Sequence, residues 1–287
     1  MNLNSDERRG LLYVGLAVGM FATSPVLVRF ATPVGAAQIT FWRMAVGALT
    51  VLALSRLLRQ PIHLPRGDMR RFVLYGLVTA LHFLFYIASL SFTSIAHSLS
   101  IIYTAPIFIA VLSAMFLGEH IARRKYIGIV IAIAGVAVLA GFEPQLTPRM
   151  LFGDLLALGS AVCFGFYSVF GRSQRARYPL LTYAFTVYGM AALWLAPAAL
   201  VSVQPVYTLP AIMAVILLGV FPSGFAHTLY NAAIRKVHAS YANLIATQEV
   251  TGGVILGFLI LGETPSLNSI VGAAIALVGI VVVLVWE

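Results

Sequence analysis

Long apolar runs without a charged side chain dominate the pattern along this chain. None of Asp, Glu, Lys or Arg occurs between Arg71 and Glu119, or between Arg177 and Arg235. A helix that crosses a bilayer takes about 20 residues, so each of these gaps holds two crossings. The runs are continuous rather than alternating, which favours helices over the strands of a membrane barrel. The pattern predicts ten spans, at residues 10–30, 36–58, 70–91, 95–117, 124–141, 151–172, 180–202, 209–233, 239–261 and 267–285.

Composition leads to the same fold class. Of the 287 residues, 61% are hydrophobic and 9% are charged, whereas soluble domains carry about 25% charged residues. We therefore expect an all-α membrane protein and no separate soluble domain. The single cysteine, Cys163, excludes a disulfide within the chain. The apolar run after Arg8 and Arg9 is longer than the core of a signal peptide and lacks a clear cleavage site, so we expect the first span to be retained.

The basic residues orient the spans. The net charge of +9 would suggest nucleic acid in a soluble protein, but here the charges follow the connections between spans. If the N-terminus is cytoplasmic, only Arg29, Arg43 and Arg149 of the 18 basic residues fall toward the outer side. The positive-inside rule therefore predicts that both termini are cytoplasmic, in a bacterial inner membrane, with lipid headgroups and not nucleic acid as the charged partner.

The two halves of the chain repeat each other. A shift of 144 residues places Leu117-Gly118-Glu119 on Leu261-Gly262-Glu263 and Gly15 on Gly159. The same shift places Gly128, Ala132 and Gly135 on Gly272, Ala276 and Gly279. Each copy holds five spans, and an odd number inverts the second copy in the membrane. We predict two inverted five-helix repeats, residues 1–143 and 144–287, which is an arrangement typical of secondary transporters.

One acidic residue lies deep in a predicted span. Glu249 sits in the middle of span nine, next to Gln248, and a charge at such a depth costs about 2.5–3.5 kcal/mol on insertion scales. Two interpretations stay open: a site for a proton or a substrate ammonium, and a structural ion pair. Arg43, about two turns into span two, is the candidate charge partner.

Polar residues and prolines also lie inside other predicted spans. The 144-residue shift places the Glu249 region on Tyr103-Thr104-Ala105-Pro106 in span four, and Tyr103, Gln248 and Glu249 are predicted substrate-binding residues. Pro106 can kink that helix, and Pro25 and Pro222 are further candidate hinges. For Pro25 and Pro222, tolerated prolines without a role in motion are at least as good an explanation.

Histidine and tyrosine form a matching pair of helix faces. His82 precedes Tyr86 by four residues and His227 precedes Tyr230 by three, so each pair shares one face. Tyr86 and Tyr230 coincide under the repeat. These residues, with Asn231 and Asn243 as weaker candidates, are predicted to line a substrate cavity; hydrogen bonding between helices is the alternative.

The chain resembles the drug/metabolite transporter superfamily, in its EamA-like ten-span branch. The resemblance rests on Gly153-Asp154-Leu155-Leu156-Ala157-Leu158, on the two Gly-Glu pairs and on Phe41-Trp42-Arg43, and it covers the whole chain. Within that branch the chain is most similar to YddG-type exporters of aromatic and other neutral amino acids. The resemblance implies a basket of helices around a central cavity, without an ATP site, that exports its solute from the cytoplasm.

The leading functional prediction is a secondary transporter that exports neutral amino acids, aromatic ones included, by alternating access. Export of other metabolites or of cationic drugs is the alternative, and proton coupling and simple equilibration both fit the sequence. An intramembrane enzyme is disfavoured because no H-E-x-x-H or G-x-S-x-G motif occurs. We expect no catalytic residue, metal or cofactor, and a small-molecule substrate as the partner besides lipid.

Overall fold

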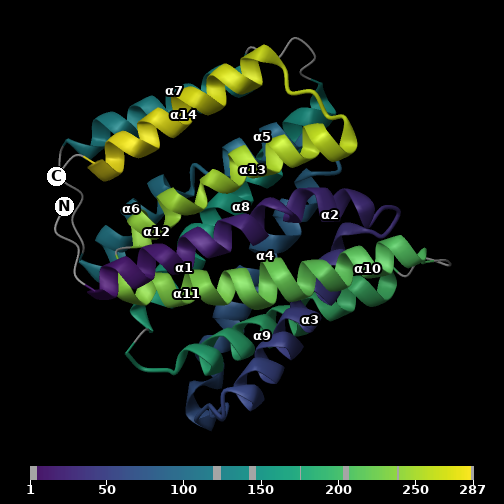
Figure 1. Ribbon diagram of the computed structural model, residues 1–287, viewed down its shortest axis with the longest axis vertical. Coiled ribbons are helices and arrows are strands. Elements are labelled where there is room, and N and C mark those ends of the chain that lie inside the picture. The colour runs from purple at the N-terminus through teal and green to yellow at the C-terminus, as the bar shows by residue number, and fades with distance from the viewer. Residues whose placement is uncertain are drawn as a thin grey trace.

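The computed structural model describes residues 5–118, 124–141, 147–174, 176–202, 207–237 and 239–285, and this part of the chain is helical without any strand (Figure 1). The helices of the first half are α1 (Ser5–Ala22), α2 (Ser24–Phe30), α3 (Ala36–Leu57), the short turn η1 (Arg66–Asp68), α4 (Met69–Ser89), α5 (Ile95–Ile102), α6 (Ala105–Leu117) and α7 (Lys125–Gly141). Those of the second half are α8 (Pro148–Ser173), α9 (Leu180–Val201), α10 (Leu209–Leu218), η2 (Gly219–Ala226), α11 (His227–Lys236), α12 (Ala239–Ala246), α13 (Gln248–Leu256), η3 (Gly257–Leu261) and α14 (Leu267–Val285).

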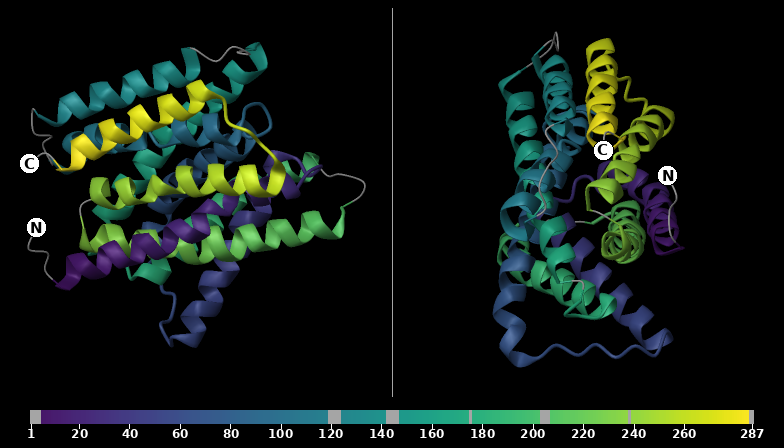
Figure 2. Two further views of the ribbon diagram at one scale, coloured as in Figure 1. Left: turned by 45° about the horizontal axis from the view of Figure 1, so that its top comes forward. Right: turned by 90° about the vertical axis from the view of Figure 1, so that its left-hand side faces the viewer.

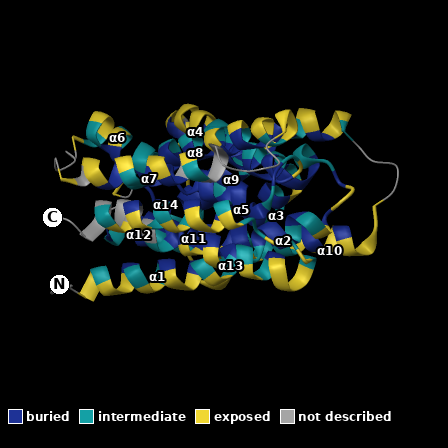
Figure 3. Ribbon diagram, turned by 90° about the horizontal axis from the view of Figure 1, so that it is seen from above, coloured by how far each residue is buried: buried dark blue, intermediate teal, exposed yellow. Residues whose placement is uncertain are grey.

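The expectation of an all-α membrane protein is confirmed. Seven helical segments of the described chain are long and apolar enough to cross a bilayer, and three shorter apolar helices accompany them, at Tyr126–Gly135, Gln248–Leu261 and Leu267–Gly279. Large apolar side chains cover the outer faces, with Met115 and Leu259 each 69% exposed. Figure 3 shows the buried residues on the inner faces of the helices. Together with the seven helical segments of spanning length, apolar surface on this scale indicates a membrane protein.

Three of the predicted spans are interrupted partway along. α1 ends at Ala22 and α2 begins at Ser24, with Pro25 in the first turn of α2. Tyr103 and Thr104 separate α5 from α6, with Pro106 in the first turn of α6, and Thr247 separates α12 from α13. Proline lacks a backbone N–H, so it tolerates a helix start and disfavours a helix interior.

The helices α7 and α14 pack against each other as a separate pair along one side of the bundle (Figures 1 and 2). A Cβ atom added at Gly135 would lie 2.3 Å from the backbone nitrogen of Ala276, and one added at Gly279 would lie 2.3 Å from that of Ala132. The contact therefore runs antiparallel and is reciprocal, because residues 132 and 135 match residues 276 and 279. Glycine at both positions lets the two backbones approach this closely.

The first helix of each half follows a different shift from the others. Gly10 in α1 faces Lys236 and Val237, and a Cβ there would lie 2.9 Å from Val237 Cγ1. Gly153 in α8 faces Phe92 and Thr93 in the same way, with Phe92 Cβ at 2.9 Å. Lys236 and Val237 stand 144 positions after Phe92 and Thr93, whereas Gly153 stands 143 positions after Gly10.

The sequence match of Gly15 with Gly159 is accordingly not repeated in the packing. A Cβ at Gly159 would lie 3.1 Å from a ring carbon of Phe85, whereas nothing lies within 4 Å of one at Gly15. The shift of 143 residues, and not 144, is the one that relates the contacts of α1 to those of α8.

Candidate functional site

A small cavity in the middle of the bundle collects most of the predicted polar residues. Its lining includes six of them, Arg43, His82, Tyr86, Tyr103, His227 and Glu249, from α3, α4, α11, α13 and the α5–α6 break. Its volume is about 20 Å³, which is room for about one water molecule. The described conformation is therefore closed around its central polar groups.

Arg43 is the most buried charged residue of this cavity, with 1% of its surface exposed. Its Nε donates to Ser223 Oγ at 2.7 Å and its Nη1 donates to Ser24 Oγ at 3.1 Å. The guanidinium carbon lies 4.5 Å from the centre of the Phe83 ring, which is close enough for a cation–π interaction. Within the described residues no carboxylate forms an ion pair with Arg43, so the groups that contact its guanidinium directly are neutral.

Glu249 lies in the first turn of α13, directly after the break at Thr247. It is 7% exposed, and its Oε2 accepts a hydrogen bond from the Tyr103 hydroxyl. A carboxylate in the first helical turn is favoured by the helix dipole. The ion pair between Glu249 and Arg43 that was one of the two interpretations is not formed, although both side chains line the same cavity.

Each histidine ring packs against an aromatic ring from the opposite half of the chain. The His82 ring stacks on Phe164 with centroids 4.8 Å apart, and the His227 ring meets Phe21 edge-on at 4.6 Å. His82 Nδ1 also lies 3.1 Å from the Ser160 carbonyl oxygen. Both histidines therefore form part of the cavity wall, with apolar rings beside them.

A second polar cluster lies next to this cavity and includes three predicted residues. Asn231 Nδ2 donates to the Tyr167 hydroxyl at 2.6 Å and to the Tyr188 hydroxyl at 3.3 Å. Asn243 Nδ2 donates to the Tyr230 hydroxyl at 3.3 Å. All five side chains are buried, and their hydrogen bonds connect α8, α9, α11 and α12. Tyr230, Asn231 and Asn243 therefore lie beside the central cavity and not in its wall.

The structure places one predicted site residue, Gln248, away from the polar groups of the site. It is exposed on the outer surface, whereas Glu249 is buried. Successive residues on a helix point about 100° apart, so only one of these two neighbours can face the cavity. The break at Thr247 sets the direction of both.

The three predicted hinge prolines all lie at irregular helical positions. Pro25 and Pro106 stand in the first turns after the breaks that separate α1 from α2 and α5 from α6. Pro222 lies inside η2, a stretch of wide π-helical turns. η2 also carries Ser223, which accepts from Arg43. The irregular segments therefore position cavity groups, whether or not they move.

Four residues of the site were not predicted from the sequence. Ser24 and Ser223 hold the Arg43 guanidinium, and Phe21 and Phe164 flank the two histidines. Serine and phenylalanine are too frequent in membrane helices for their presence to indicate a site. A match of Phe21 with Phe164 under the 143-residue shift would have found that pair.

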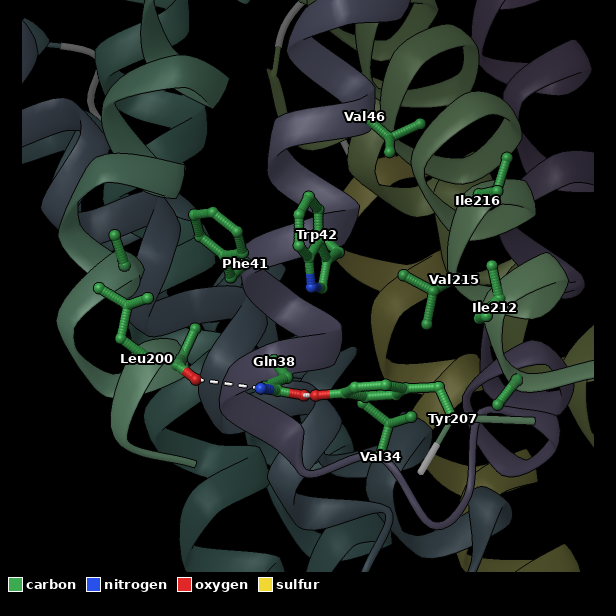
Figure 4. Close-up of a pocket in the computed structure, with 13 residues that line it drawn as sticks. Val34, Gln38, Phe41, Trp42, Val46, Leu200, Tyr207, Ile212, Val215 and Ile216 are labelled. Atoms are coloured by element: carbon green, nitrogen blue, oxygen red, sulfur yellow. Dashed lines mark hydrogen bonds between the residues drawn. The ribbon is translucent and has the colours of Figure 1, made fainter. Parts of the chain in front are cut away.

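A larger crevice opens on the lipid-facing side, between α9 and α10 and over α3 (Figure 4). Its volume is about 710 Å³, and its walls are apolar, with Phe41, Trp42 and Leu200 among them. Gln38 closes one end: its Nε2 donates to the Ala199 carbonyl at 3.1 Å, and its Oε1 accepts from the Tyr207 hydroxyl. No charged side chain lines this crevice, so the central cavity is the place for polar chemistry.

Comparison with known proteins places the chain in a family. The EamA-like transporter family matches residues 8–141 and 151–285. The chain therefore belongs to this family, within the drug/metabolite transporter superfamily, and the class of protein is a membrane transporter. A solved structure titled "Crystal structure of protein" has the same fold, with a TM-score of 0.74, 20% identity and 95% coverage of both chains.

The curated relatives are transporters and exporters. An uncharacterized transporter of Archaeoglobus fulgidus is 29% identical over 64% of this chain and 65% of its own length, so the match spans just under two thirds of that relative. The uncharacterized transporter YoaV of Bacillus subtilis is 22% identical over 94% of this chain and 91% of its own. A probable terminal-alkyne amino-acid exporter of Streptantibioticus cattleyicolor is 30% identical over 62% of this chain and 60% of its own.

Proposed function

We propose that this protein exports neutral amino acids, aromatic ones included, by alternating access. The observation that carries the proposal is the pair Arg43 and Glu249. The two residues have opposite charges, line one buried cavity, and form no ion pair with each other or with any other described residue. Buried charges are normally paired. A zwitterion would supply the partner for each: a carboxylate for Arg43 and an ammonium for Glu249.

The surroundings of the two charges suit an amino acid. A carboxylate accepts several hydrogen bonds, so Glu249 can receive an ammonium in addition to the Tyr103 hydroxyl. Phe83, Phe164 and the two histidines offer aromatic surface for an apolar or aromatic side chain. One relative carries the name of an amino-acid exporter, which agrees with this substrate class. A cationic drug fits less well because Arg43 would repel it.

The proposed architecture is ten spans in two inverted repeats, residues 1–143 and 144–287, with both termini in the cytoplasm of a bacterial inner membrane. The antiparallel, reciprocal contact of α7 with α14 supports the inversion. The seven long and three shorter apolar helices supply the number of crossings. A cavity of about 20 Å³ is too small for an amino acid, so binding requires the widening of one end that alternating access provides.

Uptake of labelled phenylalanine into proteoliposomes tests the proposal. We expect saturable uptake that unlabelled neutral amino acids inhibit strongly. Phenethylamine, which lacks the carboxylate, and phenylpropionate, which lacks the ammonium, should each compete weakly. Uptake without such selectivity, or none from correctly folded protein, would remove the amino-acid claim. Repeating the assay with an imposed pH gradient separates proton coupling from simple equilibration.

A further inference from the structure

Arg29 joins three separate segments at one end of the bundle. Its Nε lies 2.8 Å from Glu263 Oε1, and its Nη1 and Nη2 donate to the carbonyl oxygens of Leu90 and Thr93, the latter at 3.2 Å. Glu263 Oε2 also accepts the backbone N–H of Ile95 at 3.3 Å. The end of α2, the α4–α5 turn and the connection from η3 to α14 are thereby held together.

Arg172 makes the same kind of contact near the end of α8. Its Nη1 donates to the carbonyl oxygens of Val237 at 2.9 Å and of Ile234 at 3.4 Å. These two carbonyls stand 144 positions after the two that Arg29 holds. Arg172 itself stands 143 positions after Arg29, which is the shift already found for α1 and α8 from Gly10 and Gly153.

The two arginine contacts lie at opposite ends of the molecule. Arg172 binds the carbonyl of Val237, next to Lys236, whose Nζ lies 2.5 Å from Asp6 Oδ1 at the start of α1. Arg29 lies at the far end of α1 and α2. At about 1.5 Å per residue, 23 residues of helix separate the two ends by about 35 Å. In Figure 1 the start of α1 and the end of α2 lie on opposite sides of the bundle.

We infer that Arg29 and Arg172 are two matched clamps, each closing one end of the bundle, and that they release alternately. The inference rests on the proposed transport function, since a carrier opens one end at a time. Both clamps are formed in the described structure, and the central cavity is correspondingly small. In an inverted repeat, exchange of the two halves' conformations exchanges the clamps, so one opens while the other stays closed.

The two clamps differ in one described respect. Glu263 completes the Arg29 clamp as an ion pair whose side chains are each 28% exposed. The residue 144 positions before Glu263 is Glu119, which lies outside the described residues. The two clamps therefore share the hydrogen bonds that an arginine donates to two backbone carbonyl oxygens. Hydrogen bonds from a charged donor are stronger than those between neutral groups.

Cysteine labelling measures the opening of each end without any substrate. Cys163→Ala removes the native thiol, and Leu99→Cys places a reporter in the central cavity, where Leu99 is 1% exposed. A membrane-impermeant maleimide is added to one side of oriented vesicles. The side is assigned by an N-terminal tag, which lies at the Arg172 end. We expect Arg29→Gln to raise labelling from the Arg29 side about tenfold, the change that 1.4 kcal/mol produces, and to lower labelling from the other side.

Arg172→Gln should do the opposite, so each variant controls for the other. Arg56→Gln is the matched control, because Arg56 is an exposed arginine in the last turn of α3 that makes no hydrogen bond to either clamp turn among the described residues, and it should leave both rates unchanged. Equal increases from both sides would mean simple loosening of the bundle and would overturn the inference, as would unchanged rates. If a Gln variant does not insert, Arg29→Lys and Arg172→Lys test the same directions with smaller changes.

The labelling result is independent of the substrate. Opposite shifts in the two variants without phenylalanine uptake would support the clamps and reject the amino-acid proposal. Uptake together with symmetric labelling would do the reverse.

Discussion

Substitution of Arg43 by glutamine tests the proposed zwitterion site most directly. Arg43 is 1% exposed, and its guanidinium contacts the hydroxyls of Ser24 and Ser223 and lies over the rings of Phe83 and Tyr86. If it binds the substrate carboxylate, Arg43→Gln removes hydrogen bonds between charged groups, which contribute about 1.5–3 kcal/mol. The dissociation constant for phenylalanine should then rise about 10- to 150-fold.

The matched ligand makes the result specific. Phenethylamine has the same ring and ammonium but no carboxylate, so its affinity for the Arg43→Gln protein should equal or exceed its affinity for the parent. Equilibrium binding of both ligands to purified protein gives all four dissociation constants. Equal weakening of both ligands would mean that Arg43 only shapes the cavity, and an unchanged constant for phenylalanine would refute the assignment.

Folding supplies the control for this variant. A buried charge without a counter-ion is costly, so replacing it with a neutral amide should leave the melting temperature unchanged or raise it. Ser223→Ala keeps the charge but removes the acceptor of the Nε hydrogen bond. It should therefore lower the melting temperature more than Arg43→Gln does, and the reverse order would indicate that Arg43 is a structural residue.

Three further predictions concern other parts of the chain. Glu249→Gln should weaken phenethylamine binding and leave phenylpropionate binding unchanged; a variant that fails to fold would favour a structural role. Gly135→Ala should lower the melting temperature, because its Cβ would lie 2.3 Å from the backbone of α14, whereas Gly19→Ala, with nothing within 4 Å, should not. For Asp68 burial raises the pKa, but hydrogen bonds, including that from Arg177 at 2.6 Å, outweigh it and lower the pKa. Its stabilising effect is present above the unfolded pKa of about 3.9 and is lost as the pH falls through the lower folded pKa. Thermal melts of Asp68→Asn and parent should therefore differ at pH 7 and converge as the pH falls from about 4 through that folded pKa.

The helices were the most predictable feature of the fold. The expected start and end of the run at 36–58 differ from α3 by at most one residue, and those at 267–285 coincide with α14. An apolar run of about 20 residues has few ways to satisfy its backbone in lipid other than as a helix. The shift between halves was less predictable, because few identical residues define it, and contacts such as those of Gly10 and Gly153 were needed to show that α1 and α8 follow a shift of 143 residues.

The site was predictable where polarity is unusual for its depth. Glu249, Arg43 and the two histidines stand out in apolar helices, and the structure places all four around one cavity. The direction in which each side chain points around its helix was not predictable from the sequence. Gln248 is adjacent to Glu249 but faces outward, since the break at Thr247 interrupts the regular helical progression that the sequence pattern assumes.

The helix breaks connect the clamps to the site. Ser24 opens α2 directly after the break at Thr23, and its hydroxyl accepts from Arg43 at 3.1 Å and from the Tyr86 hydroxyl at 3.3 Å. Arg29 lies in the same short helix, five residues further on. Because α2 is only seven residues long and is joined to α1 at an interruption, release of Arg29 frees a segment that carries one of the groups holding the guanidinium. Opening that end would therefore change the Arg43 environment directly, and substrate bound to Arg43 would in turn alter the stability of the Arg29 clamp.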